Sequence, residues 1–240
     1  MRDSAPRRRS REFSLADVLT IGNGVCGLIG LAVLTRGAGD GSPETALEVA
    51  AALTAAGALC DGLDGAVARR FGGGRYGDML DMLSDVVTFG VLPALMVVVA
   101  DTSESVVVLA AATLYFVAVA VRLARFGATA AAGSETFSGF PCPQTAIGVA
   151  SIALLEPQPW VAAPLTLLFA ALMLSHVPYP KVSAANAPLR ACWVGLAVAA
   201  YAGAFPIEVL AIVSLTTVFA TPLLVALARA RFARREAPIW

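Results

Sequence analysis

Five aspartates lie within 25 residues of a chain that is 58% hydrophobic: Asp61, Asp64, Asp78, Asp81 and Asp85. On helices, the three-residue spacing of Asp61 and Asp64 and the four-residue spacing of Asp81 and Asp85 each place both carboxylates on one face. Carboxylates that converge in an apolar setting cannot all stay ionised without cations. Oxygen ligands suit hard divalent cations. The pattern therefore predicts a site for divalent metal ions.

A glycine-rich segment, residues 70–77, separates the two acidic pairs and predicts a turn. Two apolar helices joined by that turn run antiparallel and bring the pairs together. Two divalent ions bridged by shared carboxylates lie about 3.5–4 Å apart and can clamp a phosphoryl group. Gly65 and Ala68 leave the helix face beside the first pair without bulk, and Gly77 does the same at the start of the second helix. A ligand can therefore approach the carboxylates closely.

The elements that carry these residues are those of an integral membrane protein. The 240 residues have a mean hydropathy of +0.77 and are 14% charged, whereas soluble domains are about a quarter charged. We predict an all-α, polytopic bundle of about eight transmembrane helices. Basic tails at residues 1–13 and 229–240 flank a transmembrane catalytic domain at 14–228. The predicted spans are 15–35, 45–69, 78–100, 105–126, 143–156, 159–176, 189–205 and 207–228.

The distribution of basic residues predicts how these spans are oriented in the membrane. Eight spans place 16 of the 17 basic residues on one side, and only Arg36 on the other. The positive-inside rule then puts both termini and the acidic motif on the cytoplasmic side of the cell membrane. In the first span, small residues such as Gly24 and Gly27 favour close helix packing. We expect Asn23 in that span to form an interhelical hydrogen bond.

The acidic motif resembles that of the CDP-alcohol phosphotransferase family, D-x2-D-G-x2-A-R followed by G-x3-D-x3-D. The matching positions are Asp61, Asp64, Gly65, Ala68, Arg69, Gly77, Asp81 and Asp85. Further segments look like the phosphatidylserine synthase branch of that family: residues 20–27, 84–90, 122–126 and 137–143.

The resemblance implies a bundle of that family's type, a function and a set of residue roles. Asp61, Asp64, Asp81 and Asp85 would hold two Mg²⁺ or Mn²⁺ ions, with Asp85 also the general base. Contacts to the CDP moiety would come from Gly65, Ala68, Arg69 and Gly77. The enzyme would transfer the phosphatidyl group of CDP-diacylglycerol to L-serine, giving phosphatidylserine and CMP. A homodimer in membrane lipid is implied, and we expect no nucleic-acid partner.

Two arginines and the identity of the substrates leave alternatives open. Arg122 and Arg125 either anchor the end of a span or bind the acceptor carboxylate or a lipid phosphate, with Arg125 preferred. The guanidinium fork suits either anion. Glycerol phosphate or an inositol phosphate could replace serine, and an ether lipid could replace the acyl donor. A cation transporter that uses the aspartates as its ion site is a more distant alternative.

Overall fold

The computed structural model describes residues 12–130, 136–155, 158–175 and 178–180, together with the single residues 195 and 199. These residues form a helical bundle, which confirms the all-α class. The helices are α1 (Leu15–Asp40), α2 (Pro43–Phe71), α3 (Gly77–Asp85), the π-helix η1 (Val86–Val91), α4 (Leu92–Ala100), α5 (Val106–Ala130), α6 (Cys142–Leu154) and α7 (Pro159–Leu174).

Four helical segments of the described chain are long and apolar enough to cross a membrane: α1, α2, the continuous segment from α3 to α4, and α5. They correspond to the first four predicted spans. The next two predicted spans correspond to α6 and α7, which have 13 and 16 residues and are shorter than the roughly 20 residues of a straight crossing. Predicted spans 189–205 and 207–228 lie outside the described residues, so the count of eight remains a prediction.

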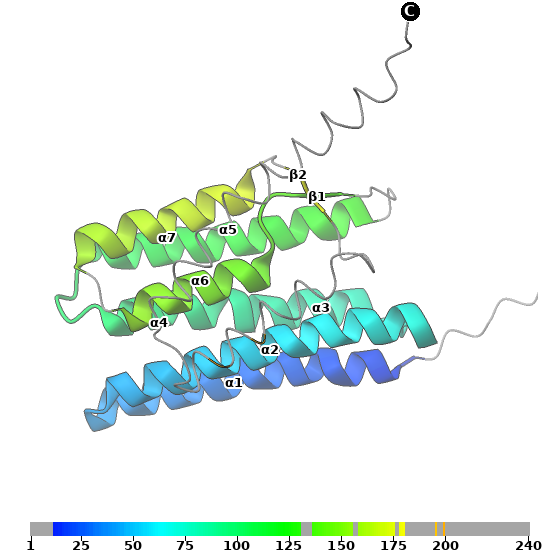
Figure 1. Ribbon diagram of the computed structural model, residues 1–240, viewed down its shortest axis with the longest axis horizontal. Coiled ribbons are helices and arrows are strands. Elements are labelled where there is room, and N and C mark those ends of the chain that lie inside the picture. The colour runs from blue at the N-terminus through cyan, green and yellow to red at the C-terminus, as the bar shows by residue number, and fades with distance from the viewer. Residues whose placement is uncertain are drawn as a thin grey trace, which may run out of the picture.

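The helices lie side by side and alternate in direction along the chain (Figure 1). α1 and α2 pack together on one flank, and α5 and α7 pack together on the other. Between them lie the segment from α3 to α4 and the short helix α6, which is buried along nearly its whole length. The end of α2, the start of α3 and the end of α5 therefore meet at one end of the bundle.

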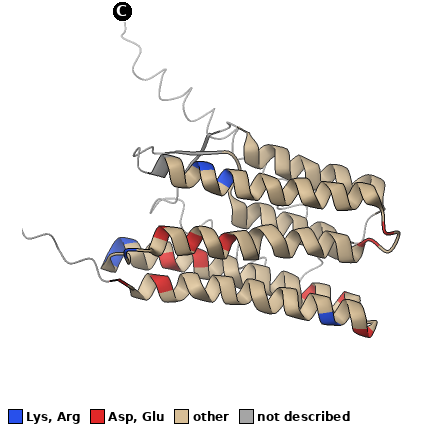
Figure 2. Ribbon diagram, turned by 180° about the vertical axis from the view of Figure 1, so that it is seen from behind, with Lys and Arg blue, Asp and Glu red and all other residues tan. Residues whose placement is uncertain are grey.

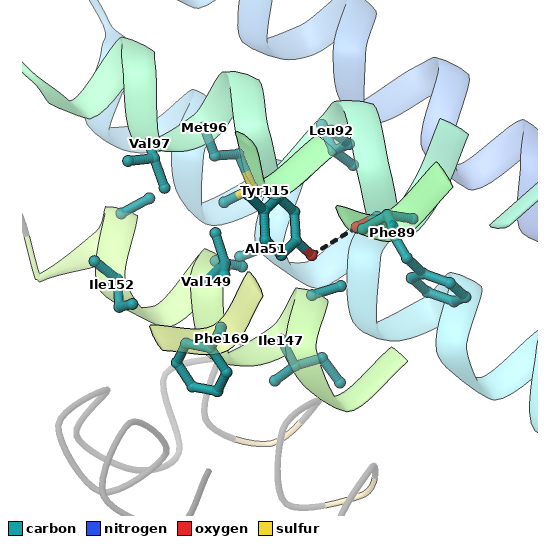
Figure 3. Close-up of a cluster of buried hydrophobic side chains, with 14 of the residues drawn as sticks. Ala51, Phe89, Leu92, Met96, Val97, Tyr115, Ile147, Val149, Ile152 and Phe169 are labelled. Atoms are coloured by element: carbon teal, nitrogen blue, oxygen red, sulfur yellow. Dashed lines mark hydrogen bonds between the residues drawn. The ribbon is translucent and has the colours of Figure 1, made fainter. Parts of the chain in front are cut away.

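A proline explains the π-helix in the third segment. Pro93 has no N–H, so it cannot donate to the carbonyl of Phe89, four residues earlier, as an α-helix requires. In η1 the backbone widens, and Leu92 N donates to Val87 O. Tyr115 of α5, which is fully buried, supplies the missing donor: its hydroxyl donates to Phe89 O at 2.7 Å (Figure 3). The packed core around it thus fixes an irregular turn directly after Asp85.

Small residues of α1 permit its close approach to η1, as predicted. A Cβ atom at Gly27 would lie 2.5 Å from Thr88 Oγ1 and 2.9 Å from Thr88 Cα. The start of α1 is fixed by a capping box, in which Ser14 N donates to Asp17 Oδ2 and Asp17 N donates to Ser14 Oγ. Because the box links both ends of the first turn, α1 begins at a defined residue.

One short strand pairing was not predicted. β1 (Thr136–Ser138) runs antiparallel to β2 (Pro178–Pro180). Between β1 and α6 the chain turns at Gly139, whose φ of 86° suits glycine. Phe140 N then donates to Leu172 O at the end of α7. The segment before α6 is thereby attached to the end of α7.

Candidate active site

Three of the predicted aspartates converge at one end of the bundle. Asp61 reaches the group from α2, and Asp81 and Asp85 reach it from α3. One carboxylate oxygen from each lies within 4.8 Å of the others. Figure 2 shows acidic residues gathered on neighbouring helices at this end, with basic residues close by. The turn between α2 and α3 thus brings together carboxylates from both pairs, as their spacing predicts.

The donor set and its surroundings fit a divalent cation. All three groups offer carboxylate oxygens, the ligands that Mg²⁺ and Mn²⁺ prefer. Asp85 is 5% exposed, and Asp61 and Asp81 are half-buried. Asp81 Oδ1 is buried and accepts no hydrogen bond. An unsatisfied buried acceptor is unfavourable by about 1–3 kcal/mol, and a cation between the carboxylates would satisfy it.

Asp64 lies beside this group but is not one of its three members. Its side chain is 7% exposed and accepts a hydrogen bond from Thr20 Oγ1 of α1. Thr20 itself is buried, and its hydroxyl also lies 3.2 Å from Ala16 O. Sequence reasoning had not singled out Thr20, although it begins the segment 20–27 that we had noted. One predicted ligand is therefore oriented by a hydroxyl of the first helix.

Asp85 is held from the same helix. Asn23 Nδ2 donates to Asp85 Oδ1 at 2.9 Å. This confirms the expected interhelical hydrogen bond of Asn23 and identifies its partner as Asp85, the predicted general base. Asn23 and Thr20 are three residues apart, so α1 presents both toward the acidic hairpin from one face.

The predicted CDP-contacting residues lie near the end of α2 and at the first position of α3. Gly65 leaves its face open to Arg69, whose Nη1 lies 3.2 Å from the position of a Cβ at Gly65. Ala68 is half-buried, and Arg69 is exposed. A guanidinium beside a bare helix face can approach a phosphate without steric hindrance.

Gly77 has a packing role that sequence reasoning missed. A Cβ at Gly77 would lie 2.9 Å from Asp17 Oδ1, and a Cβ at Gly74 would overlap the same carboxylate. Asp17 is 1% exposed. The capping-box spacing of Ser14 and Asp17 was the available signal for this buried carboxylate. The absence of a side chain at Gly77 is thus explained by the close packing of Asp17 as well as by the proposed nucleotide contact.

The two arginines at the end of α5 differ in their partners. Arg122 Nη1 donates to Cys142 Sγ at 3.0 Å, at the start of α6. Arg125 Nη1 donates to Leu174 O at 3.0 Å, at the end of α7. Arg122 therefore contacts the start of α6, whereas Arg125 contacts the end of α7.

Comparison with known proteins identifies a family. The model of the CDP-alcohol phosphatidyltransferase family matches residues 13–178. A CDP-diacylglycerol–serine O-phosphatidyltransferase of Mycobacterium leprae is 36% identical over 177 residues, which cover 66% of this chain and 59% of the relative. An archaetidylserine synthase of Methanothermobacter thermautotrophicus is 30% identical over 179 residues, 73% of each chain.

The match to the mycobacterial relative spans about three fifths of that protein's length. A serine O-phosphatidyltransferase of Methanocaldococcus jannaschii is 37% identical over 124 residues, which cover 51% of this chain and 59% of the relative. The family match contains the whole acidic hairpin, both arginines at the end of α5, and α6 and α7. The chain belongs to the CDP-alcohol phosphatidyltransferase family.

Proposed function

We propose that this protein transfers the phosphatidyl group of CDP-diacylglycerol to the hydroxyl of L-serine, giving phosphatidylserine and CMP. The observation that carries the proposal is the convergence of Asp61, Asp81 and Asp85 within 4.8 Å in an apolar bundle. Family membership supports the CDP-activated donor, and the names of the mycobacterial relatives, CDP-diacylglycerol–serine O-phosphatidyltransferases, support serine.

The carboxylates would hold two Mg²⁺ or Mn²⁺ ions. Asp61, Asp81 and Asp85 form the group that fits a cation directly, and Asp64, oriented by Thr20, supplies the fourth carboxylate. When bound, the ions would neutralise the pyrophosphate and stabilise the CMP leaving group. Gly65, Ala68, Arg69 and Gly77 would contact the CDP moiety at the end of α2 and the following turn.

Asp85 would act as the general base. It takes the proton of the serine hydroxyl while that oxygen attacks the phosphatidyl phosphorus of the donor. The new serine O–P bond forms as the P–O bond to CMP breaks, and CMP leaves with the released electron pair. Burial of Asp85 in the bundle keeps bulk water from competing as the attacking nucleophile.

Arg122 would bind the serine carboxylate. We prefer it to Arg125 because its Nη1 reaches the start of α6, whereas Arg125 Nη1 is engaged by Leu174 O at the end of α7. A guanidinium can bind a carboxylate bidentately. Serine bound in this way would have its hydroxyl close to the proposed base.

An acceptor screen tests the proposal. Purified protein is incubated with CDP-diacylglycerol, Mn²⁺ and one acceptor at a time: L-serine, glycerol 3-phosphate or an inositol phosphate. CMP release and the mass of the product lipid are measured, with Asp81→Asn as the control. We expect phosphatidylserine from the native protein. Product from glycerol 3-phosphate alone would contradict serine as acceptor, and absence of CMP release with every acceptor would contradict the transferase assignment and leave the cation transporter.

A second donor is favoured by one comparison. The archaetidylserine synthase matches 73% of this chain, so we also propose testing a CDP-activated ether lipid. The ratio of kcat/KM for the acyl and ether donors decides between them. We expect the acyl donor to be preferred, because the mycobacterial serine O-phosphatidyltransferase is more similar in sequence, at 36% identity against 30%.

We propose that the active site faces the cytoplasm and that residues 14–228 form one transmembrane catalytic domain between two basic tails. Segregation of 16 of the 17 basic residues supports this orientation. The proposed homodimer rests on family resemblance. Mass measurement of the protein in detergent, corrected for bound detergent, tests it, and a monomer mass would contradict it.

A further inference from the structure

Asn23 contacts the proposed base from a helix that carries none of the family motif. It lies on α1, it is fully buried, and its Nδ2 donates to Asp85 Oδ1 at 2.9 Å. Of the two polar atoms of the amide only the nitrogen can donate, so Asn23 presents Nδ2 to Asp85. A buried hydrogen bond to a charged acceptor is among the stronger protein hydrogen bonds. It therefore restricts rotation of the Asp85 carboxylate.

The position of Asn23 is itself fixed by two neighbouring helices. Thr88 Oγ1 of η1 donates to the backbone oxygen of Asn23 at 2.8 Å. On the other side, Asn23 Oδ1 faces Gly57 of α2, where a Cβ would lie 2.8 Å from that oxygen. Because Gly57 leaves this space and Thr88 holds the backbone, the amide is held between α2 and η1.

One polar atom of the Asn23 amide has no hydrogen-bond partner in the described part of the chain. Asn23 Oδ1 is buried and has no hydrogen-bond donor. A buried, unsatisfied oxygen is unfavourable, and an apolar residue of similar shape would avoid it. Buried polar atoms normally have a hydrogen-bond partner, and an exception beside a reactive group points to a functional role.

We propose that Asn23 is a positioning residue that engages Oδ1 of Asp85 and thereby leaves Oδ2 to face the cations and the acceptor hydroxyl. This inference rests on the proposed function, because it gives different roles to the two carboxylate oxygens of Asp85, the proposed general base. A carboxylate cannot serve as a full ligand and as a base with both oxygens engaged in coordination. The hydrogen bond from Asn23 fixes Oδ1 of Asp85, so Oδ2 is the oxygen that would bind the cations and accept the proton.

The test combines metal binding with steady-state kinetics. Asn23→Leu removes the donor and keeps a similar shape, and Asn23→Ala removes it with less bulk. Mn²⁺ is titrated into each purified variant without substrate, and binding is followed by electron paramagnetic resonance. We expect the Kd for Mn²⁺ to rise about tenfold and kcat to fall about 10- to 100-fold, since losing a residue that orients a metal ligand has effects of this size. The KM for CDP-diacylglycerol should change less than twofold.

Thr54→Val is the matched control. Thr54 is also fully buried, but its hydroxyl donates to Ala50 O within α2 and does not touch the acidic group. We expect its Kd for Mn²⁺ and its kcat to match those of the native protein. A merely structural Asn23 would lower the yield of folded protein while leaving kcat and the Kd of the folded fraction unchanged. That result in either Asn23 variant would overturn the inference.

The outcomes also separate this inference from the proposed function. If the native protein binds Mn²⁺ and releases CMP but either Asn23 variant behaves like Thr54→Val, only the positioning role is wrong. If the native protein neither binds Mn²⁺ nor releases CMP, the proposed function itself is wrong, and the positioning role is wrong with it.

Discussion

At the scale of single residues, Asp81 provides the clearest electrostatic reason for a cation. Its Oδ1 is buried without a hydrogen bond, and it belongs to a group of three carboxylates within 4.8 Å. Like charges at such distances repel strongly in an apolar environment. Cation binding would convert this unfavourable arrangement into a ligand set. The same repulsion makes the group sensitive to neutral substitutions.

We predict that Asp81→Asn abolishes metal-dependent turnover without unfolding the protein. The amide has the same shape but supplies a weaker ligand, so kcat should fall by at least about 100-fold. In the absence of metal, its melting temperature should equal or exceed that of the native protein, because one charge of the repelling group is gone. Thermal melting and CMP release, with and without EDTA, measure both effects. Full activity of this variant would contradict the metal site.

A second prediction at this scale distinguishes the two arginines. Arg122→Lys should raise the KM for serine about tenfold, because an ammonium cannot reproduce the bidentate fork. The KM for CDP-diacylglycerol should change little. Arg125→Lys should have the smaller effect on serine, since Arg125 Nη1 binds Leu174 O. Steady-state kinetics on both variants provide the comparison, and a larger effect at Arg125 would reverse our assignment.

At the scale of elements, the long helices follow from composition, whereas the local irregularities depend on tertiary contacts. The first four predicted spans agree with α1, α2, the segment from α3 to α4, and α5 within about five residues at each end. Hydropathy over some 20 residues suffices for such segments. The π-helix η1 could not be predicted in this way, because it needs both Pro93 and a hydroxyl donor from a different helix, Tyr115.

The same distinction, between what sequence spacing predicts and what tertiary packing decides, applies to the candidate site. The convergence of Asp61, Asp81 and Asp85 could be predicted from spacing and a glycine-rich turn. The roles of Thr20 and Asp17 could not, because they depend on how α1 packs against the hairpin. Asn23 was expected to bond another helix, but only the packing identifies Asp85 as its partner. Motif spacing places residues along one hairpin, and it carries no information about the helix that covers it.

Tyr115→Phe tests whether η1 helps to position the carboxylates of the proposed active site. Removing the hydroxyl takes away the side-chain donor to the Phe89 carbonyl, and Pro93 has no N–H to replace it. We expect a loss of about 1–3 kcal/mol in unfolding free energy, as for other unsatisfied buried groups. A several-fold fall in kcat should accompany it, because η1 directly follows Asp85.

Thermal or denaturant unfolding in detergent measures the stability of this variant, and CMP release measures kcat. Thr113→Val serves as the control, since Thr113 lies on the same helix, is exposed, and donates only to Leu109 O. A Tyr115→Phe variant as stable and as active as Thr113→Val would show that the hydroxyl is dispensable.

At the scale of the whole molecule, the distribution of charge and the arrangement of the helices both place the acidic site at the basic end of the bundle. The ends of α2 and α5 and the start of α3 meet at one end of the bundle. The segments at that end carry five arginines: Arg69, Arg70, Arg75, Arg122 and Arg125. The loop between α4 and α5 carries Asp101 and Glu104 at the other end. A positively charged end is retained in the cytoplasm.

The last prediction concerns this orientation, and single cysteines at three positions test it. Asp3→Cys and Pro238→Cys mark the two tails, and Ser103→Cys marks the exposed loop between α4 and α5. Intact cells are treated with a membrane-impermeant maleimide, with the native protein and its four cysteines as the background. We expect labelling above background only at position 103. In inverted membrane vesicles, positions 3 and 238 should be labelled instead.

Each pattern has a separate meaning because the three positions report on different crossings. Labelling of position 103 in intact cells with protection of position 3 agrees with the three crossings of α1, α2 and the segment from α3 to α4, and it places the acidic hairpin in the cytoplasm. Protection of position 238 then requires an even number of crossings, as the eight-span arrangement predicts. Exposure of position 238 in intact cells would rule out eight spans and leave the hairpin where it is, since α1 to α5 would be unaffected. Exposure of position 3 would instead place the acidic site outside the cell, away from CDP-activated lipid and cytoplasmic serine, and would contradict the proposed function.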